Sequence, residues 1–158
     1  MMSYLQEEGL KCEVSGGDVI FEYKDCFFNV HINLNDGFGE CSIVFECEDE
    51  EYEKLDQEKK AFMADKVNVD TDNHATIIAY QSSFEAKTSF YFTNKGMLLN
   101  LFSSHFEELT DSVCEAIDIV GTEIEEQKQS SGRRIGFNTE TYQIKNQKPE
   151  EVQIAAKA

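Results

Sequence analysis

Basic residues are scarce in this sequence, and this scarcity limits the kinds of partner that the protein can have. Lysine and arginine total 14 against 31 aspartates and glutamates, which gives a net charge of −17. Residues 127–158 hold 6 basic and 3 acidic residues, which leaves 8 basic and 28 acidic residues in the first 126. A body this acidic repels phosphate backbones and anionic lipids, so we expect neither nucleic acid nor a membrane as partner. It attracts a basic protein instead.

Long apolar runs and paired cysteines are also missing. No stretch approaches the roughly 18 apolar residues of a membrane-spanning helix. Residues 1–10 contain two glutamates and a glycine, whereas a signal peptide begins with basic residues and continues as an apolar segment. The five cysteines are odd in number, and no two of them form a C-x-x-C pair. These features predict a cytoplasmic protein with reduced thiols, and a disulfide between Cys26 and Cys41 stays open as the less favoured alternative.

The longest regular pattern covers residues 94–127. Apolar residues recur there every three or four positions with acidic residues between them, which predicts an amphipathic helix. Two starting points are open. The helix begins near Asn94, or it begins at the capping box Ser104-His105-Phe106-Glu107 and residues 96–102 form a strand. The apolar positions are Leu98, Phe102, Phe106, Leu109, Val113, Ile117, Val120 and Ile124.

Alternating apolar and polar residues predict strands elsewhere in the chain, joined by connections short enough for hairpins. Ser3 and Gln6 form a capping box for a short first helix that ends at Gly9. A second helix is expected over 49–66. The predicted fold is α+β, an antiparallel sheet of about five strands with helices packed on one face, in the order α-βββ-α-ββ-α. The predicted strands cover residues 18–24, 26–33, 40–47, 75–81 and 86–93.

Two domain-level segments follow from this pattern. Residues 1–127 are predicted to form a single α+β domain. Residues 128–158 are rich in Gln, Ser, Asn and Lys, and we expect a polar, weakly basic tail that is extended or mobile.

No motif for catalysis or metal binding is complete. The segment from Asp70 to His74 begins like a calcium loop, but Ala75 stands where that loop needs glycine. The three histidines, His31, His74 and His105, are scattered over a strand, a turn and a helix without ligand spacing, so no zinc site is expected. Neither a G-x-S-x-G turn nor a local cysteine signature marks a nucleophile. The sequence therefore predicts no catalytic residue, no metal, no cofactor and no enzyme.

Apolar side chains occur on more than one side of two segments. Phe90, Tyr91 and Phe92 are consecutive, so at least one of the three must leave the main face of the sheet. The start of the long helix is apolar on more than one side, which predicts burial against a partner or a second copy. A tail that folds back over this surface is an equally favoured alternative. The expected partner-binding or dimer surface comprises Phe90, Phe92, Met97, Leu99, Leu101 and Phe102.

The order of elements resembles the type III secretion chaperone-like fold, and in particular the bacterial YbjN-type proteins. The resemblance covers about residues 3–126. It rests on YLQEEGL at residues 4–10, on GDVIFEY at 17–23 and on FFNV at 27–30. Members of this fold are small and acidic, are often dimeric, and hold a partner polypeptide.

The resemblance implies a homodimeric, chaperone-like protein-binding module that masks a segment of a partner, with no family catalytic residues to carry over. Apolar grooves would supply contact area, and the acidic field would speed encounter with a basic client. An exposed strand edge would offer a second route, by strand addition. Two alternatives are open: an antitoxin or immunity-type protein that blocks a basic toxin, and a small ligand-binding protein with a pocket between sheet and helix.

Overall fold

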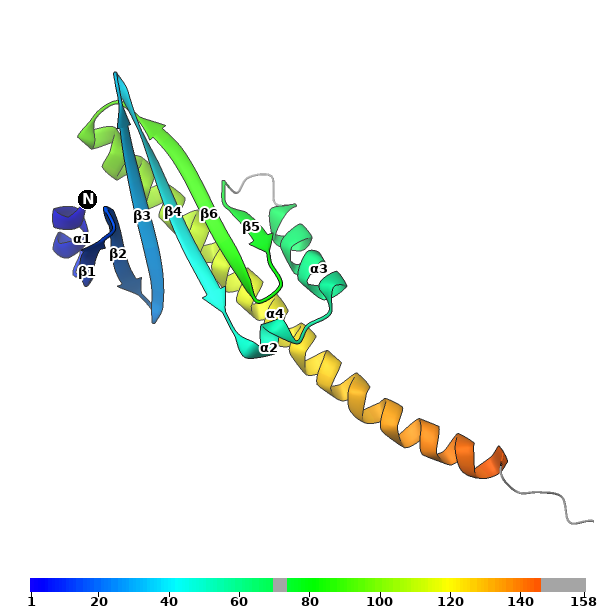
Figure 1. Cartoon of the computed structure of the whole chain (residues 1–158). Coiled ribbons are helices and arrows are strands. Elements are labelled where there is room, and N and C mark those ends of the chain that lie inside the picture. Colours follow the sequence, from blue (N-terminus) through cyan, green and yellow to red (C-terminus); the bar gives the residue numbers. More distant parts are fainter. Residues whose placement is uncertain (70–73, 146–158) are drawn as a thin grey trace, which may run out of the picture. The chain divides into compact units, whose positions relative to one another are not determined.

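Six antiparallel strands form one sheet in the order β1-β2-β3-β4-β6-β5 (Figure 1). The computed structural model describes residues 1–69 and 74–145, with side chains described up to residue 131. The predicted α+β class and the antiparallel sheet are confirmed, although the sheet has one strand more than the pattern indicated. The strands are β1 (Cys12–Ser15), β2 (Asp18–Tyr23), β3 (Cys26–Asn35), β4 (Phe38–Glu48), β5 (Thr76–Ala79) and β6 (Ser83–Phe92).

Two tight hairpins fix the register at one end of the sheet. The β1–β2 turn has positive φ at Gly16 (62°) and Gly17 (97°), and the β2–β3 turn has positive φ at Lys24 (50°) and Asp25 (62°). Two central residues with positive φ give the turn twist that matches antiparallel strands. As a result, Phe21 pairs directly with Phe28 across β2 and β3.

The helices differ from the predictions mainly at their ends. The segment expected to form one helix over 49–66 is split into α2 and α3, and α1 begins without a side-chain cap, so the predicted Ser3 capping box is wrong. The long helix begins next to Asn94, whose Oδ1 accepts a hydrogen bond from Met97 N at 2.9 Å; this rules out the alternative start at Ser104. The helices are α1 (Met2–Glu7), α2 (Glu50–Glu53), α3 (Gln57–Asn68) and α4 (Lys95–Lys145).

The chain divides into two compact units, Met1–Ile124 and Glu125–Ala158. The first unit contains the whole sheet. In the second, residues 128–145 are helical, whereas the sequence predicted an extended or mobile tail from residue 128. Residues 146–158 lie outside the described residues, as do residues 70–73 of the calcium-like segment.

A buried lysine explains the split between α2 and α3. The side chain of Lys60 is 2% exposed, and its Nζ donates to the carbonyl oxygens of Glu53 (3.0 Å) and Gln81. It lies 5.0 Å from the centroid of the Tyr52 ring. The lysine therefore satisfies a carbonyl at the end of α2 and ties it to the β5–β6 turn, a tertiary contact that helical periodicity cannot reveal.

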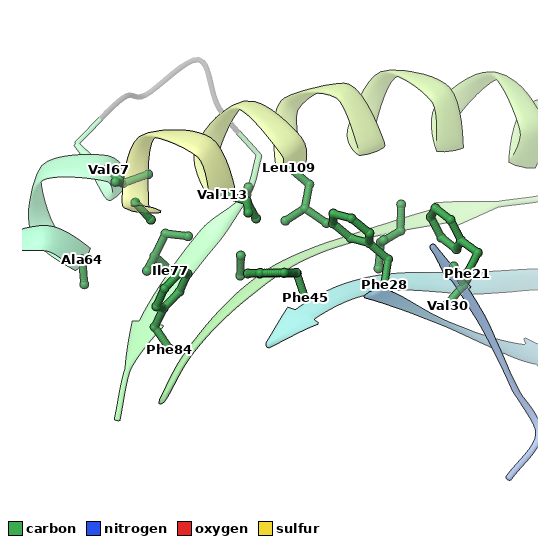
Figure 2. Close-up of a cluster of buried hydrophobic side chains, with 14 of the residues drawn as sticks. Phe21, Phe28, Val30, Phe45, Ala64, Val67, Ile77, Phe84, Leu109 and Val113 are labelled. Atoms are coloured by element: carbon green, nitrogen blue, oxygen red, sulfur yellow. The ribbon is translucent and has the colours of Figure 1, made fainter. Parts of the chain in front are cut away.

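The core lies between the sheet and the helices. Figure 2 shows side chains of the strands meeting Leu109 and Val113 of α4, with Ala64 and Val67 of α3 beside them. Alternate residues of each strand point toward this side, as the period of two in the sequence requires. Fully buried members include Phe21, Phe28, Val30, Ile43, Ile77, Phe84 and Leu109.

The five cysteines carry free thiols, so the alternative Cys26–Cys41 disulfide is not formed. Cys41 is buried on the core side of β4, and burial raises the pKa of its thiol to about 12. This thiol behaves as a small apolar side chain. Over the described part of the chain, no helix combines the length and apolarity of a membrane span.

Candidate functional site

Within the described residues of the first unit, no helix covers the face of the sheet opposite the core, and we call it the open face (Figure 1). The strand register assigns it the odd residues of β3 and β6 and the even residues of β4. Large apolar side chains lie on it: Phe27 is 65% exposed, Tyr91 is 61% exposed and Phe38 is 45% exposed. A contiguous patch of exposed apolar side chains is a feature of binding surfaces, whereas single exposed ones are ordinary.

Aromatic rings occur toward both ends of the open face. Phe38 and Tyr91 form an edge-to-face pair with ring centroids 5.7 Å apart, and Phe27 lies on the open face near the β2–β3 turn. Polar pairs lie between them. His31 Nδ1 lies 2.6 Å from Asp18 Oδ1.

This contact lowers the pKa of the Asp18 carboxyl, chiefly through the hydrogen bond from His31. Along its length, the open face thus carries aromatic side chains toward both ends and polar pairs between them. This pattern suits an extended segment.

The open face is also acidic. Within the described strands, six glutamates lie on it against one lysine, Lys87. Carboxylates around exposed aromatic rings attract lysine and arginine side chains while the rings accept apolar ones. The glutamates are Glu13, Glu22, Glu40, Glu46, Glu48 and Glu85.

The two edges of the sheet differ in how they are covered. At β5, the side chain of Asn68 pairs with the backbone of Ile77: Oδ1 accepts from Ile77 N and Nδ2 donates to Ile77 O, both at 2.8 Å. This occupies the positions that an added strand would need. At β1, no backbone hydrogen bond among the described residues reaches the outer edge. Because α1 contacts β1, this edge is open to an extended peptide only where α1 leaves it uncovered.

Hollows border the sheet in the described part of the chain, and two of them bear on binding. One, of 230 Å³, follows β1 and β2, and its lining includes Ile20 and Phe27 of the open face. The other, of 330 Å³, lies between α1, β2 and α4 and is lined by Tyr4, Tyr23 and Phe106 among others. The second is the sheet–helix hollow in which a small ligand would sit. Its charged lining residues are the carboxylates Glu8 and Glu107.

A cluster of His74, His105 and Glu108 lies on the helix-covered side of the sheet. Their potential ligand atoms lie within 4.8 Å of one another. His74 precedes β5, and its Nδ1 lies 2.7 Å from Glu108 Oε2. His105 is half-buried, with its ring stacked on Phe90 at 4.7 Å. The three histidines are scattered along the sequence, but the fold brings His74 and His105 together.

Charge and burial set the protonation of this cluster. Burial lowers the pKa of His105, helped by the nearby His74, whereas the Glu108 carboxylate opposes this change. Burial acts to raise the pKa of Glu108, but hydrogen bonds from the side chain and backbone of His74 outweigh it, so the pKa is lowered. At neutral pH, Glu108 is therefore ionised and His105 is neutral.

The residues expected to form a partner or dimer surface are only partly accessible. Phe90 (6% exposed), Phe92 (7%) and Phe102 (2%) belong to the core, which corrects their assignment to a surface in the isolated chain. The physical reason is strand parity: Phe90 and Phe92 point toward α4, and Tyr91 is the aromatic side chain that leaves the main face. Leu99 and Leu101 are half-buried and Met97 is exposed, so a partner role for these three stays a prediction.

No family model and no curated protein matches this sequence. Among solved structures, an uncharacterized protein from Methanothermobacter thermautotrophicus aligns with a TM-score of 0.57 at 14% identity, covering 78% of this chain and 95% of that chain. YbjN from E. coli aligns with a TM-score of 0.48 at 12% identity, covering 74% and 88%. The first likeness shows a shared α+β fold, and the likeness to YbjN is too weak to carry an argument.

Proposed function

We propose that this protein is a non-catalytic protein-binding module that masks an extended segment of a partner polypeptide on the open face of its sheet. The observation that carries the proposal is the exposure of Phe27 (65%), Tyr91 (61%) and Phe38 (45%) on that face. Covering one such side chain is worth about 1.5–3 kcal/mol, so the three contribute at most about 4.5–9 kcal/mol, and further contacts must offset the cost of association.

The glutamates around these rings specify the chemistry of the partner. A segment that carries lysine or arginine beside apolar residues would match both the carboxylates and the rings. An extended conformation also allows strand addition at the part of the β1 edge that α1 leaves uncovered. The chaperone-like mode, the homodimer and the cytoplasmic location follow from the resemblance and the composition, and they belong to this proposal.

A peptide array tests the proposal in the absence of a known partner. The array varies net charge and apolar content independently, and the retained protein is detected through a tag. We expect retention by peptides that are both basic and apolar, and loss of retention in Phe27→Ser and Tyr91→Ser. Phe62→Ser is the matched control, because Phe62 is 50% exposed on α3, away from the open face. Equal loss in the control, or retention that ignores peptide charge, would contradict the proposal.

A further inference from the structure

We propose that His74, His105 and Glu108 form a binding site for one Zn²⁺ ion. Two imidazoles and one carboxylate are a known ligand set for zinc, which takes such ligands at about 2.0–2.2 Å in tetrahedral geometry. The site lies on the helix-covered side of the sheet and is separate from the open face. It is therefore an activity additional to polypeptide binding.

The backbone brings these residues together from two elements. His105 and Glu108 are three positions apart in α4, which places both on the same face of the helix. His74 reaches them from the segment before β5, 31 residues earlier in the chain than His105. Its ring centroid lies 5.0 Å from that of His105. Two of the three ligands thus come from a rigid helix, and the third comes from the chain that crosses it.

The surroundings of His105 engage one of its two ring nitrogens. Nδ1 of His105 lies 2.9 Å from Thr88 Oγ1, and Thr88 is 1% exposed. This hydrogen bond engages Nδ1 and leaves Nε2 as the nitrogen that can bind a metal. A metal-binding histidine commonly uses its other nitrogen in this way, which fixes the tautomer and the ring orientation. Stacking on Phe90 holds the same ring from its face.

The two more exposed ligands already approach each other. Glu108 Oε2 accepts from both His74 Nδ1 (2.7 Å) and His74 N (3.2 Å). Atoms held by one tetrahedral zinc ion lie roughly 3.3 Å apart, so side chains whose ligand atoms are up to 4.8 Å apart must move closer by about 1.5 Å when the ion binds. With three protein ligands, the fourth position of the ion is left to water.

A second pair in the same chain provides a matched control. His31 Nδ1 lies 2.6 Å from Asp18 Oδ1, with side chains 61% and 28% exposed, against 65% and 30% for His74 and Glu108. The two pairs are alike in distance and exposure. The difference is that His105 stands beside one of them, and no such third ligand group is found beside the other among the described residues.

Zinc titration of the full chain, in competition with a chromophoric chelator, tests the site. We expect one ion per chain, with affinity lowered at least about tenfold in His74→Gln, His105→Gln and Glu108→Gln, and unchanged in His31→Gln. Thr88→Val, which keeps the buried volume and removes the hydroxyl, should weaken binding by roughly tenfold through His105. Circular dichroism of each variant confirms that it is folded.

Cobalt substitution separates this site from the five thiols. Co²⁺ at a His/His/Glu site gives visible d–d bands without the near-ultraviolet band of sulfur-to-cobalt charge transfer. Zinc binding that survives in all three ligand variants would overturn the proposal. So would a cobalt spectrum dominated by thiolate ligation, or a wild-type chain that binds no zinc in the micromolar range.

Discussion

Phe27 and Phe28 are neighbours in β3 and have opposite environments. Phe28 is 2% exposed, with its ring 5.4 Å from that of Phe45 and 5.0 Å from that of Phe106, whereas Phe27 is 65% exposed on the open face. The same residue type thus stabilises the fold at one position and is available for binding at the next. The two faces of this sheet differ in role because of parity along the strand, and not because of composition.

The largest expected effect is on the free energy of unfolding, when each of these two side chains is replaced by alanine in a separate variant. Phe28→Ala should lower the free energy of unfolding by about 3–5 kcal/mol, because it leaves a cavity among packed rings. Phe27→Ala should change it by less than about 0.5 kcal/mol. Urea titration followed by circular dichroism measures both values. Similar losses in the two variants would show that the open face is packed against something in the isolated protein.

A smaller effect is expected at Gly39, which lies under the ring of Phe92 on the core side of β4. A Cβ added at Gly39 would fall inside the space of that ring, so Gly39→Ala forces Phe92 to move. We expect a loss of about 1–3 kcal/mol, measured by the same titration. Ser42→Ala, on the open face of the same strand, is the comparison and should cost clearly less, although it breaks a 3.0 Å hydrogen bond with Ser89. The reverse order would contradict the assignment of faces.

The acidic charge of the open face predicts a salt effect on binding. The Debye length falls from about 30 Å at 0.01 M to about 8 Å at 0.15 M ionic strength. For a basic peptide selected on the array, the association rate should therefore fall by roughly tenfold over this range. Stopped-flow fluorescence or surface plasmon resonance measures the rate. If the rate does not respond to salt, apolar contact alone accounts for binding and the glutamates play no part in recognition.

The smallest expected effect is a pH dependence on the helix-covered side. Because the pKa of His105 is lowered in the folded state, the unfolded chain takes up a proton more readily. The contribution of neutral His105 to the free energy of unfolding is fully present above pH 6.5. It is lost as the pH falls from there through the folded-state pKa of His105. His74 and Glu108 lie beside the His105 ring, and Thr88 is hydrogen-bonded to it.

Glu108 contributes to the same trend at lower pH. Its pKa is lowered from 4.5, so its share of the stability is present above pH 4.5 and is lost as the pH falls through the folded-state pKa. Urea midpoints between pH 7.5 and 5.5, with metal removed by a chelator, isolate the His105 effect. His105→Gln should flatten the profile relative to wild type. Parallel profiles for wild type and His105→Gln would contradict the prediction.

Features set by local periodicity could be predicted from the sequence. The period of two identified five of the six strands, and the spacing of three and four residues identified α4. The spacing left the start of α4 open between Asn94 and Ser104, and the cap at Asn94 decides it. The strand β1 was missed because its four residues, CEVS, lack the apolar run that marks β5, TIIA, a strand of the same length. The break between α2 and α3 depends on the buried Nζ of Lys60, a tertiary contact without a local signal.

The candidate sites were harder to predict for the same reason. The argument that one aromatic of residues 90–92 must leave the main face is confirmed, and it is Tyr91. The pattern did not show on which side the helices would lie, so Phe90 and Phe92 were assigned to a surface although they belong to the core. The cluster of His74 with His105 and Glu108 joins residues about thirty positions apart, and only the crossing of α4 by the chain before β5 brings them together.

Site-specific photo-crosslinking in native cells tests the central claim most directly. A photoreactive phenylalanine analogue is placed at Phe27, at Tyr91 or, as the control, at Phe62, and the crosslinked peptide is identified by mass spectrometry. We expect both open-face positions to capture the same polypeptide, in a segment that combines basic and apolar residues, and position 62 not to capture it. Equal capture at position 62, or no capture at Phe27 and Tyr91, would contradict the assignment of binding to the open face.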